Sequence, residues 1–282
     1  MRYLLYNPLS EKEKQSITEA ECYEVLSNIP TKLVDMTKLA NLRDFFEGLN
    51  TCDDVVVFGG DGTLNKVANE LTDCFIRNDI YYFPCGMDND FARDIDACNV
   101  RIPVLINDYI KSLPTVTVKG EQCKFINCVG FGLDGYCCEV ADLLKSQRKK
   151  PNYIAIAIKG VLFHFKPVNA TVVVDGRTYH FKKVWIAPTM FGRFYGGGIM
   201  PTPNQNRNMT EKKVSFMAFH YAGKFKLLAM LPSSFKGRHV KYKNNVTIIE
   251  GKIISVTFDR PASLQIDGET VLNVKSYIVE CK

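Results

Sequence analysis

Long apolar runs are missing from this sequence, and their absence excludes a helix that could cross a membrane. The longest run after the N-terminus, Tyr153 to Phe165, is interrupted by Lys159 and is too short to span a bilayer. The opening stretch MRYLLY ends at Asn7 and Pro8, which is too short for a signal peptide. With 46% hydrophobic and 23% charged residues among 282, the composition is typical of a soluble globular protein of one large or two ordinary domains. We therefore expect a cytoplasmic protein.

Paired metal ligands are also missing. None of the ten cysteines forms a CxxC pair with a second ligand pair at zinc spacing, so buried reduced thiols are expected. The four histidines have no convergent partners in the sequence, which argues against a histidine-based mechanism. No zinc finger, helix-turn-helix or RNA-binding aromatic motif occurs, so we expect no nucleic-acid partner.

Positive charge is in excess and is clustered. The formal net charge is +6, and basic residues gather between Lys145 and Lys150 and again between Lys224 and Lys243. Such patches suit an anionic membrane surface or acidic substrates. An ordinary solvated surface is the alternative.

The pattern of the first 118 residues alternates between strands and helices. The strands RYLLY, TKLVDM, VVVF and IYYFP are separated by stretches with helical spacing of apolar residues. This alternation predicts a parallel sheet covered by helices.

From about residue 119 the pattern changes. Two helical stretches, 133–147 and 152–164, are followed by short alternating strands, among them RTYHFKKVWIAP. Dipeptides such as Asp175-Gly176 are hairpin signals between these strands. The second half therefore predicts an antiparallel sandwich or barrel.

A glycine-rich turn follows the third strand in the sequence VVVFGGDGTLNKVAN. Gly59, Gly60 and Gly62 permit a positive φ and let a bulky anion approach the backbone. Amides at the start of the next helix, near Thr63, would attract phosphate. Asp61 beside phosphates implies an intervening Mg²⁺. The loop is no Walker A motif, because no GKS or GKT follows, and a tight turn with Asp61 as a helix cap is the alternative.

The turn resembles the nucleotide-binding signature of the diacylglycerol kinase catalytic family, which includes sphingosine, ceramide and bacterial lipid kinases. Further blocks resemble that family in the same order along nearly the whole chain. They are Tyr6-Asn7-Pro8, FPCGMDNDFARDI, FINCVGFGLDG, YGGGIMPTP and QIDGE. NAD kinases and 6-phosphofructokinases share the GGDG core, but the NDFAR and DGE blocks favour lipid kinases.

The resemblance implies an α/β protein of two domains. A Rossmann-like, doubly wound nucleotide-binding domain would span residues 1–118, and an antiparallel β-sandwich or barrel for the lipid would span 119–282. In this family the C-terminal segment can pack back on the first domain, so the boundary is approximate.

The resemblance also implies ATP and Mg²⁺ as cofactors and assigns site residues. Asp61, with Asp90 as a helper, would hold Mg²⁺ beside the phosphates. The expected nucleotide-binding residues are Asn7, Thr37, Gly59, Gly60, Asp61, Gly62, Thr63, Asn65, Gly86 and Asn89.

By the same resemblance, Asp267 is the general base and Glu269 supports it or the metal. Their spacing in IDGET would place both carboxylates on one face of a strand, although Gly268 can bend the chain. An Asp-Gly hairpin turn is the alternative. Asp134 in GFGLDG either lines the site or caps the following helix.

The function implied is an ATP-dependent lipid kinase that converts diacylglycerol to phosphatidic acid. Because its substrate is a membrane lipid, we expect peripheral, transient membrane association. Candidate lining for an apolar slot, with core packing as the alternative, is Phe163, Phe165, Phe191, Phe194 and Tyr195.

Two other functions stay open, a small-molecule kinase similar to NAD kinase and a catalytically silent lipid- or nucleotide-binding regulator. The silent regulator is motivated by Lys66, Met87 and Thr117, which depart from the family pattern. The stretch NQNRNMTEKK also lacks the Asp-Asp-Gly that can hold a structural Mg²⁺ in the family. The oligomeric state, with a homodimer as one option, stays open.

Overall fold

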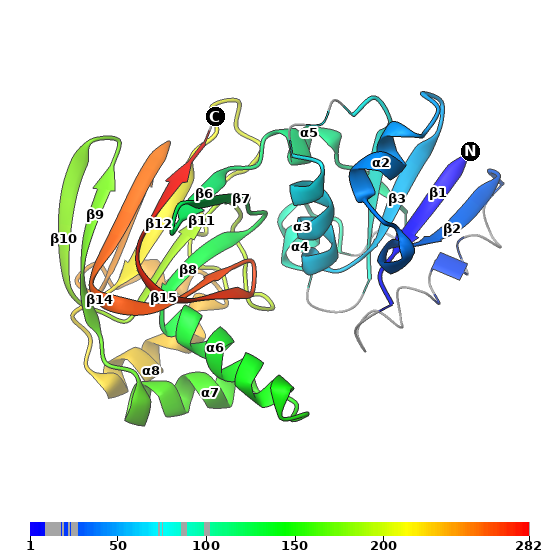
Figure 1. The fold of residues 1–282 in the computed structure, drawn as a ribbon. Helices are drawn as coiled ribbons and strands as arrows, with labels where there is room; N and C mark the ends of the chain where they lie inside the picture. Colours follow the sequence, from blue (N-terminus) through cyan, green and yellow to red (C-terminus); the bar gives the residue numbers. More distant parts are fainter. Residues whose placement is uncertain are drawn as a thin grey trace. The chain divides into compact units, whose positions relative to one another are not determined.

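The computed structural model describes residues 1–8, 18, 20, 21, 23, 28–72, 74, 76–85, 89–98 and 102–281. The chain divides into two compact units, Met1–Leu113 and Pro114–Lys282, and each has its own sheet (Figure 1). The boundary lies before, not after, the strand β6 (Thr115–Val118). This strand pairs with β15 (Glu269–Glu280), the last strand of the second unit.

The first unit is built on a mostly parallel sheet, as the alternating pattern predicted. Its order is β2-β1-β3-β4-β5, and only β5 runs antiparallel to its neighbour. Buried Val55, Val56 and Val57 of β3 form the middle of this sheet. The strands are β1 (Arg2–Tyr6), β2 (Thr31–Asp35), β3 (Asp54–Gly59), β4 (Asp79–Pro84) and β5 (Val104–Leu105).

Short helices follow the strands of the first unit. Among those whose bounds the structure describes, the longest is α3, which buries Leu64, Val67 and Ala68 at helical spacing. The helices with described bounds are the 3₁₀ turn η1 (Met36–Lys38), α2 (Leu42–Glu47), α3 (Asp61–Glu70), α4 (Asp90–Asp94) and α5 (Asn107–Lys111). The strand order reverses between β1 and β3, and such a switch point in an open sheet of this class is where ligands bind.

The second unit is an antiparallel β-sandwich, which confirms the predicted fold class. All strand pairs in its described part are antiparallel. The long strand β14 pairs with β9 through its first half and with β8 through its last residues. The strands besides β6 and β15 are β7 (Glu121–Lys124), β8 (Cys128–Gly132), β9 (Val168–Val174), β10 (Arg177–Val184), β11 (Ile186–Met190), β12 (Val214–Phe219), β13 (Val246–Gly251) and β14 (Ile253–Ile266).

The stretch RTYHFKKVWIAP is two strands rather than the single one predicted. The register breaks between Phe181 and Val184, where Lys183 has a φ of 52°. β10 therefore pairs with β9, whereas β11 pairs with β8 and β12. The bulge redirects the chain from one part of the sandwich to the other.

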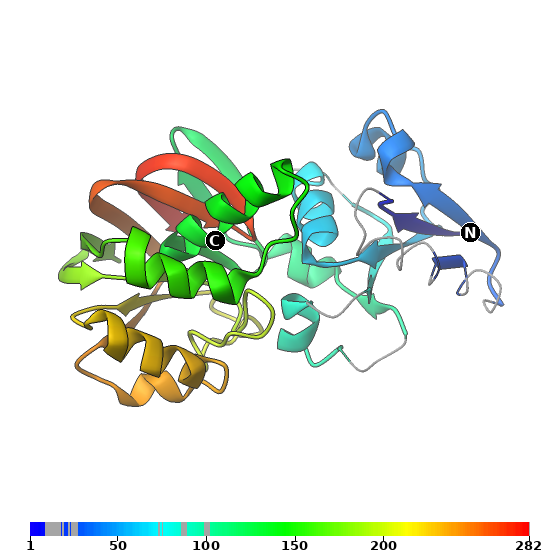
Figure 2. The same cartoon turned by 90° about the horizontal axis from the view of Figure 1, so that it is seen from below.

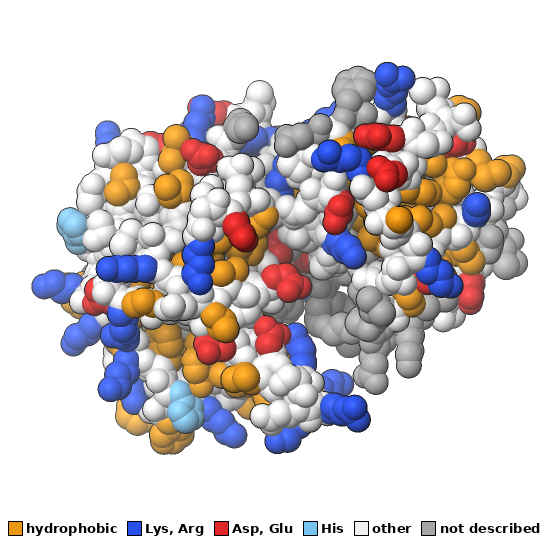
Figure 3. Space-filling model, viewed as in Figure 1, with side chains coloured by type: hydrophobic (Ala, Val, Ile, Leu, Met, Phe, Trp, Pro, Cys, Tyr) orange, Lys and Arg blue, Asp and Glu red, His pale blue; other side chains and the backbone are white. Residues whose placement is uncertain are grey.

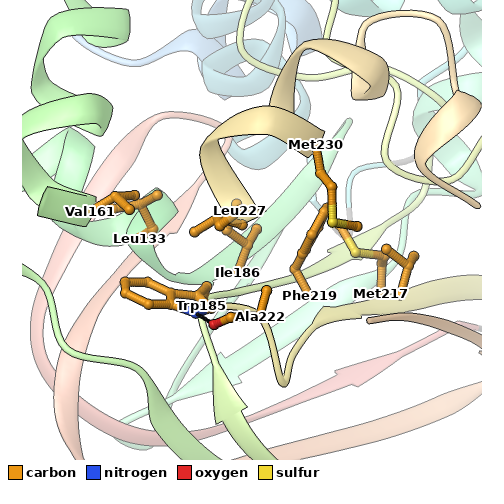
Figure 4. Packing of buried hydrophobic residues seen from close by; sticks show 10 residues of the cluster. Leu133, Val161, Trp185, Ile186, Met217, Phe219, Ala222, Leu227 and Met230 are labelled. Atoms are coloured by element: carbon orange, nitrogen blue, oxygen red, sulfur yellow. Dashed lines mark hydrogen bonds between the residues drawn. The ribbon is translucent and has the colours of Figure 1, made fainter. Parts of the chain in front are cut away.

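Helices cover one side of the sandwich (Figures 1 and 2). They are α6 (Leu133–Ser146), α7 (Tyr153–Lys159), the π-helical turn η2 (Gly160–His164), α8 (Lys224–Ser234) and the 3₁₀ turn η3 (Arg238–Lys241). The first three match the predicted helical stretches, and α8 was not predicted. Figure 4 shows Leu227 and Met230 of α8 packed toward Phe219, while the Trp185 Nε1 donates to the Ala222 carbonyl at 2.8 Å. Within the described part of the chain, no helix is long and apolar enough to cross a membrane.

Candidate functional site

Expected nucleotide-binding residues of the first unit follow the carboxyl ends of neighbouring parallel strands. Asn7 follows β1, Thr37 lies in η1 after β2, and Gly60 follows β3. Tyr6, the last residue of β1, is aligned with Asp35 of β2 and Phe58 of β3. The topology therefore places these residues along one edge of the sheet, where open α/β sheets bind ligands. Gly86, expected beside them, and Met87 lie outside the described residues.

Close packing explains two of the three glycines in the turn, and neither needs a positive φ. A Cβ on Gly59 would lie 2.7 Å from the Cβ of Thr63, and a Cβ on Gly60 would lie 3.3 Å from the Asn89 Oδ1. A Cβ on Gly62 would meet no atom of the described residues within 4 Å. None of the three has a positive φ, so this turn does not use that freedom of glycine. Gly62 is exposed at the start of α3.

Asp61 joins the glycine turn to the NDFAR block. Its Oδ2 accepts hydrogen bonds from the backbone N–H of Asp90 at 2.9 Å and of Phe91 at 3.2 Å. Asp61 thus caps α4 rather than its own helix, α3, which begins without a side-chain cap. The start of α3 and its backbone amides are suited to phosphate.

Asn89 is held from both sides. Its Nδ2 donates to the Cys85 carbonyl at 3.1 Å, and its Oδ1 faces the Tyr82 hydroxyl at 3.4 Å. Burial raises the pKa of Tyr82 well above its ordinary value, and the Asp61 charge adds to this, so the hydroxyl keeps its proton. Asn89 therefore has a fixed orientation beside Gly60.

The carboxylates of this unit are better suited to a cation that is also bound by nucleotide phosphates than to a metal held by protein ligands alone. The buried Asp90 forms an ion pair with Arg93 at 2.7 Å, so part of its charge is already compensated. Among the described residues, no group of three or more His, Cys, Asp or Glu side chains is placed to hold a metal. Mg²⁺ is commonly bound by one or two carboxylates together with substrate phosphates. Asp61 fits that role, and Asp90 fits a supporting one.

Two further nucleotide candidates lie near this edge. Asn65 is in the second turn of α3, where its side chain accepts a hydrogen bond from the Asn69 Nδ2 at 3.0 Å. Thr37 is exposed, and its hydroxyl donates to the Asp35 Oδ1 at 2.6 Å. Lys66 is exposed on α3.

In the second unit, Asp267 occupies an Asp-Gly hairpin turn. Asp267 has a φ of 46° and Gly268 one of 95°, and β15 begins at Glu269. The two carboxylates therefore do not alternate along one strand, and that expectation is wrong. The Asp267 carboxylate accepts hydrogen bonds from the backbone N–H groups of Ile126, Asn127 and Cys128. Glu269 is exposed at the start of β15.

The chain contains a second turn of the same construction. Asp175 also has a φ of 46°, and its carboxylate accepts from the backbone N–H of Lys252 at 3.0 Å and of Ile253 at 2.8 Å. Backbone capture by an Asp-Gly turn is therefore a structural device in this fold. What distinguishes Asp267 is its surroundings.

One of these surroundings is a buried arginine that the sequence analysis missed. Arg207, from the NQNRN stretch, is 2% exposed, and its Nη2 donates to the Asn127 Oδ1 at 3.1 Å. Its guanidinium carbon lies 5.5 Å from the centre of the Phe191 ring. Asn127 therefore links this cationic side chain to the turn, because its backbone N–H donates to the Asp267 carboxylate. Arg207 belongs to the stretch that lacks Asp-Asp-Gly. The only signal in the sequence was an arginine in a polar loop.

Asp134 belongs to a second cluster in this unit. It lies in the first turn of α6, which has no side-chain cap, and it accepts a hydrogen bond from the Tyr195 hydroxyl at 2.8 Å. Its other oxygen, Oδ2, is buried without a partner among the described residues. Burial raises the pKa of Asp134 to about 7, although the bond from Tyr195 opposes this shift. Asp134 therefore does not act as a helix cap.

The replacement Asp134→Asn is expected to remove a pH dependence of stability. Because the pKa is raised from 3.8 to about 7 on folding, this group's contribution is fully present below about pH 4 and is lost as the pH rises through 7. At alkaline pH the free energy of unfolding of the wild type should be lower than that of the variant by up to about 4 kcal/mol. Urea unfolding of both proteins across this range measures the difference. If the free energies of unfolding of the two proteins changed with pH in parallel, Asp134 would ionise with an ordinary pKa.

A hollow of about 520 Å³ lies between the helical layer and β14–β15. It is lined by apolar and basic side chains, namely Tyr136, His164, Phe165, Lys166, Val168, Arg260, Pro261, Ala262 and Leu272, together with Glu139, Ser263 and Asn273. Of the aromatic residues proposed to line a slot, Phe165 lines this hollow. Phe163 is exposed, whereas Phe191 and Phe194 are buried.

The chain thus combines a mostly parallel α/β unit with an antiparallel β-sandwich unit. Residues 2–118 match the family model of the diacylglycerol kinase catalytic domain. Residues 127–279 match the model described as the YegS C-terminal NAD kinase beta sandwich-like domain. The chain belongs to the diacylglycerol kinase family, which supports a kinase that acts on a lipid.

Individual relatives cover most of the chain. It is 26% identical to the protein YtlR of Bacillus subtilis (strain 168) over 234 residues, which are 76% of this chain and 73% of that one. It is 25% identical over 284 residues to a diacylglycerol kinase of the same strain, covering 94% of this chain and 88% of that one. A solved structure from Bacillus anthracis str. Sterne shares the fold with a TM-score of 0.68 at 17% identity, covering 99% of this chain and 93% of that one.

Proposed function

We propose that this protein is an ATP-dependent lipid kinase that transfers the γ-phosphate of ATP to the hydroxyl of diacylglycerol and forms phosphatidic acid. The observation that carries the proposal is the bond network of Asp61, which joins GGDGT to NDFAR at the carboxyl edge of the parallel sheet. Family membership and this network support a nucleotide phosphate site in the first unit.

The reaction forms a bond between the lipid hydroxyl oxygen and the γ-phosphorus, and the bond from that phosphorus to the bridging oxygen of ADP breaks. The open start of α3 would bind phosphate oxygens, with Gly62 allowing their approach. Mg²⁺, when bound with ATP, would neutralise phosphate charge beside Asp61.

Asp267 would receive the hydroxyl proton. Its carboxylate is fixed by three backbone donors, which suits a residue that must orient a nucleophile. Because an alcohol is a very weak acid, such a base chiefly positions the hydroxyl and takes the proton late. Glu269, two residues away and exposed, would support it.

The acceptor is identified by offering γ-labelled ATP and Mg²⁺ with several acceptors in parallel. Diacylglycerol, sphingosine and ceramide are supplied in mixed micelles, and NAD is supplied in solution. Label in phosphatidic acid is the expected result. Label in NAD alone would replace the proposal by a small-molecule kinase, and ATP binding without transfer to any acceptor would favour a silent regulator.

A further inference from the structure

The most exposed large hydrophobic side chains of the described residues gather on one part of the second unit. Phe225 is 80% exposed, Phe163 is 75% exposed and Ile154 is 67% exposed. They belong to α8, η2 and α7, the elements of the helical layer. We call the outer side of α7, η2 and the first turn of α8 the helical surface.

The elements of this surface are fixed to one another and to the core. The Lys224 Nζ donates to the Leu162 carbonyl, which links the start of α8 to η2. On the inner side, Val161 and Leu227 belong to one buried cluster (Figure 4). The inner side chains therefore account for the packing of these elements, and the outer phenylalanines add nothing to that core.

The sequence segments that carry these phenylalanines have charge of one sign. The sequence contains no Asp or Glu from residue 143 to 174 or from residue 212 to 249. Figure 3 shows hydrophobic and basic side chains together at the lower left, over α7 and α8. The exposed basic residues on or beside the helical surface are Lys145, Arg148, Lys149, Lys150, Lys159, Lys166, Lys224 and Lys226.

The nearest acids in the sequence before this region, on α6, already have partners. Asp142 forms an ion pair with Lys145 at 3.0 Å and accepts a hydrogen bond from Thr270. Glu139 accepts a hydrogen bond from Ser263. These contacts direct the acids toward β14 and β15, and Lys145 compensates the charge of Asp142. The helical surface therefore keeps a positive potential.

We propose that the helical surface docks on an anionic lipid bilayer, with Phe163 and Phe225 inserted at the headgroup level. Aromatic side chains on a basic helical face are the features by which helices lie in a membrane interface. Each lysine near an anionic leaflet adds attraction. A second copy of the chain fits poorly, because a symmetric contact would oppose like charges.

The hollow lies next to the helical surface, and docking would give a lipid substrate access to it. This step rests on the proposed function. His164, Phe165 and Lys166 line it and directly follow Phe163 in the chain. Insertion of Phe163 would therefore bring the rim of the hollow to the lipid surface. A lipid could then enter from the bilayer without crossing water.

Co-sedimentation with vesicles, without ATP, tests the surface. The wild type is expected to bind vesicles of phosphatidylcholine mixed with phosphatidylglycerol, to bind phosphatidylcholine alone weakly, and to be released by salt. Phe163→Ala and Phe225→Ala should each weaken binding about tenfold, and the double variant about a hundredfold. Ile102→Ala, a 64% exposed residue of the first unit, is the matched control and should bind as the wild type does.

Equal binding by the wild type and the double variant would overturn the proposal, as would equal binding to neutral and anionic vesicles. A concentration-dependent dimer in sedimentation velocity that both Phe→Ala changes abolish would also overturn it, in favour of a second copy. Transfer to a dispersed short-chain diacylglycerol separates the two proposals. The variants should retain that activity, and its absence from all proteins, with vesicle binding as expected, would reject the proposed function and leave the surface supported.

Discussion

Replacing Asp267 by Asn is expected to reduce phosphoryl transfer by about a thousandfold, within the range of proton-transfer and positioning residues. The change removes the group proposed to orient the lipid hydroxyl. It also replaces a carboxylate oxygen, which accepts backbone N–H bonds, by an amide nitrogen that cannot accept them. A loss of about 1–3 kcal/mol in the free energy of unfolding should therefore accompany the loss of activity.

The second Asp-Gly turn provides the matched control. Asp175→Asn breaks the same kind of backbone contacts, to Lys252 and Ile253, and should cost a similar amount of stability. Its transfer rate should stay near that of the wild type. Equal losses of activity in both variants would contradict a catalytic role for Asp267 and would leave it as a turn residue.

Gly62→Val is expected to reduce transfer by about a hundredfold without lowering the melting temperature. A Cβ here meets no atom of the described part of the chain, so the fold can accept a side chain. It would occupy the open approach to α3, and a displacement of the phosphates by about 1 Å can cost about a hundredfold in rate. The γ-phosphate transfer assay and thermal unfolding measure the two effects, and isothermal titration with an ATP analogue shows whether nucleotide affinity falls as well.

Two other glycines sharpen this result. Gly223 precedes α8, and a Cβ there likewise meets no atom of the described residues, so Gly223→Val should leave nucleotide binding unchanged. Gly59→Ala should destabilise the protein by about 1–3 kcal/mol, because its Cβ would collide with Thr63. Unchanged nucleotide affinity and transfer in Gly62→Val would place the phosphates elsewhere.

The fold class was predictable because hydrophobic periodicity reports local burial. The VVVF run is a buried central strand, and alternation along β9 matches its alternating burial. The sequence did not predict the helix α8, because Pro232 and the basic residues interrupt the helical spacing of its apolar residues. Its burial depends on Trp185 and Phe219, which are distant in the sequence.

The residues of the site were recognisable, but their contacts were not. Asp61 reaches the N–H groups of Asp90 and Phe91 only because β3 and β4 lie side by side. Asp267 reaches residues 126–128 only because β14 pairs with β8. Arg207 is buried against the usual preference of arginine for the surface, and no local pattern predicts that.

The most direct test of the central claim is a stoichiometric transfer measurement. The protein is incubated with γ-labelled ATP, Mg²⁺ and dispersed diacylglycerol, and ADP is quantified together with label in the lipid extract. One labelled phosphatidic acid for each ADP, in a reaction that requires Mg²⁺, is the predicted result. ADP formed without labelled lipid, or bound ATP that is never consumed, would contradict a diacylglycerol kinase.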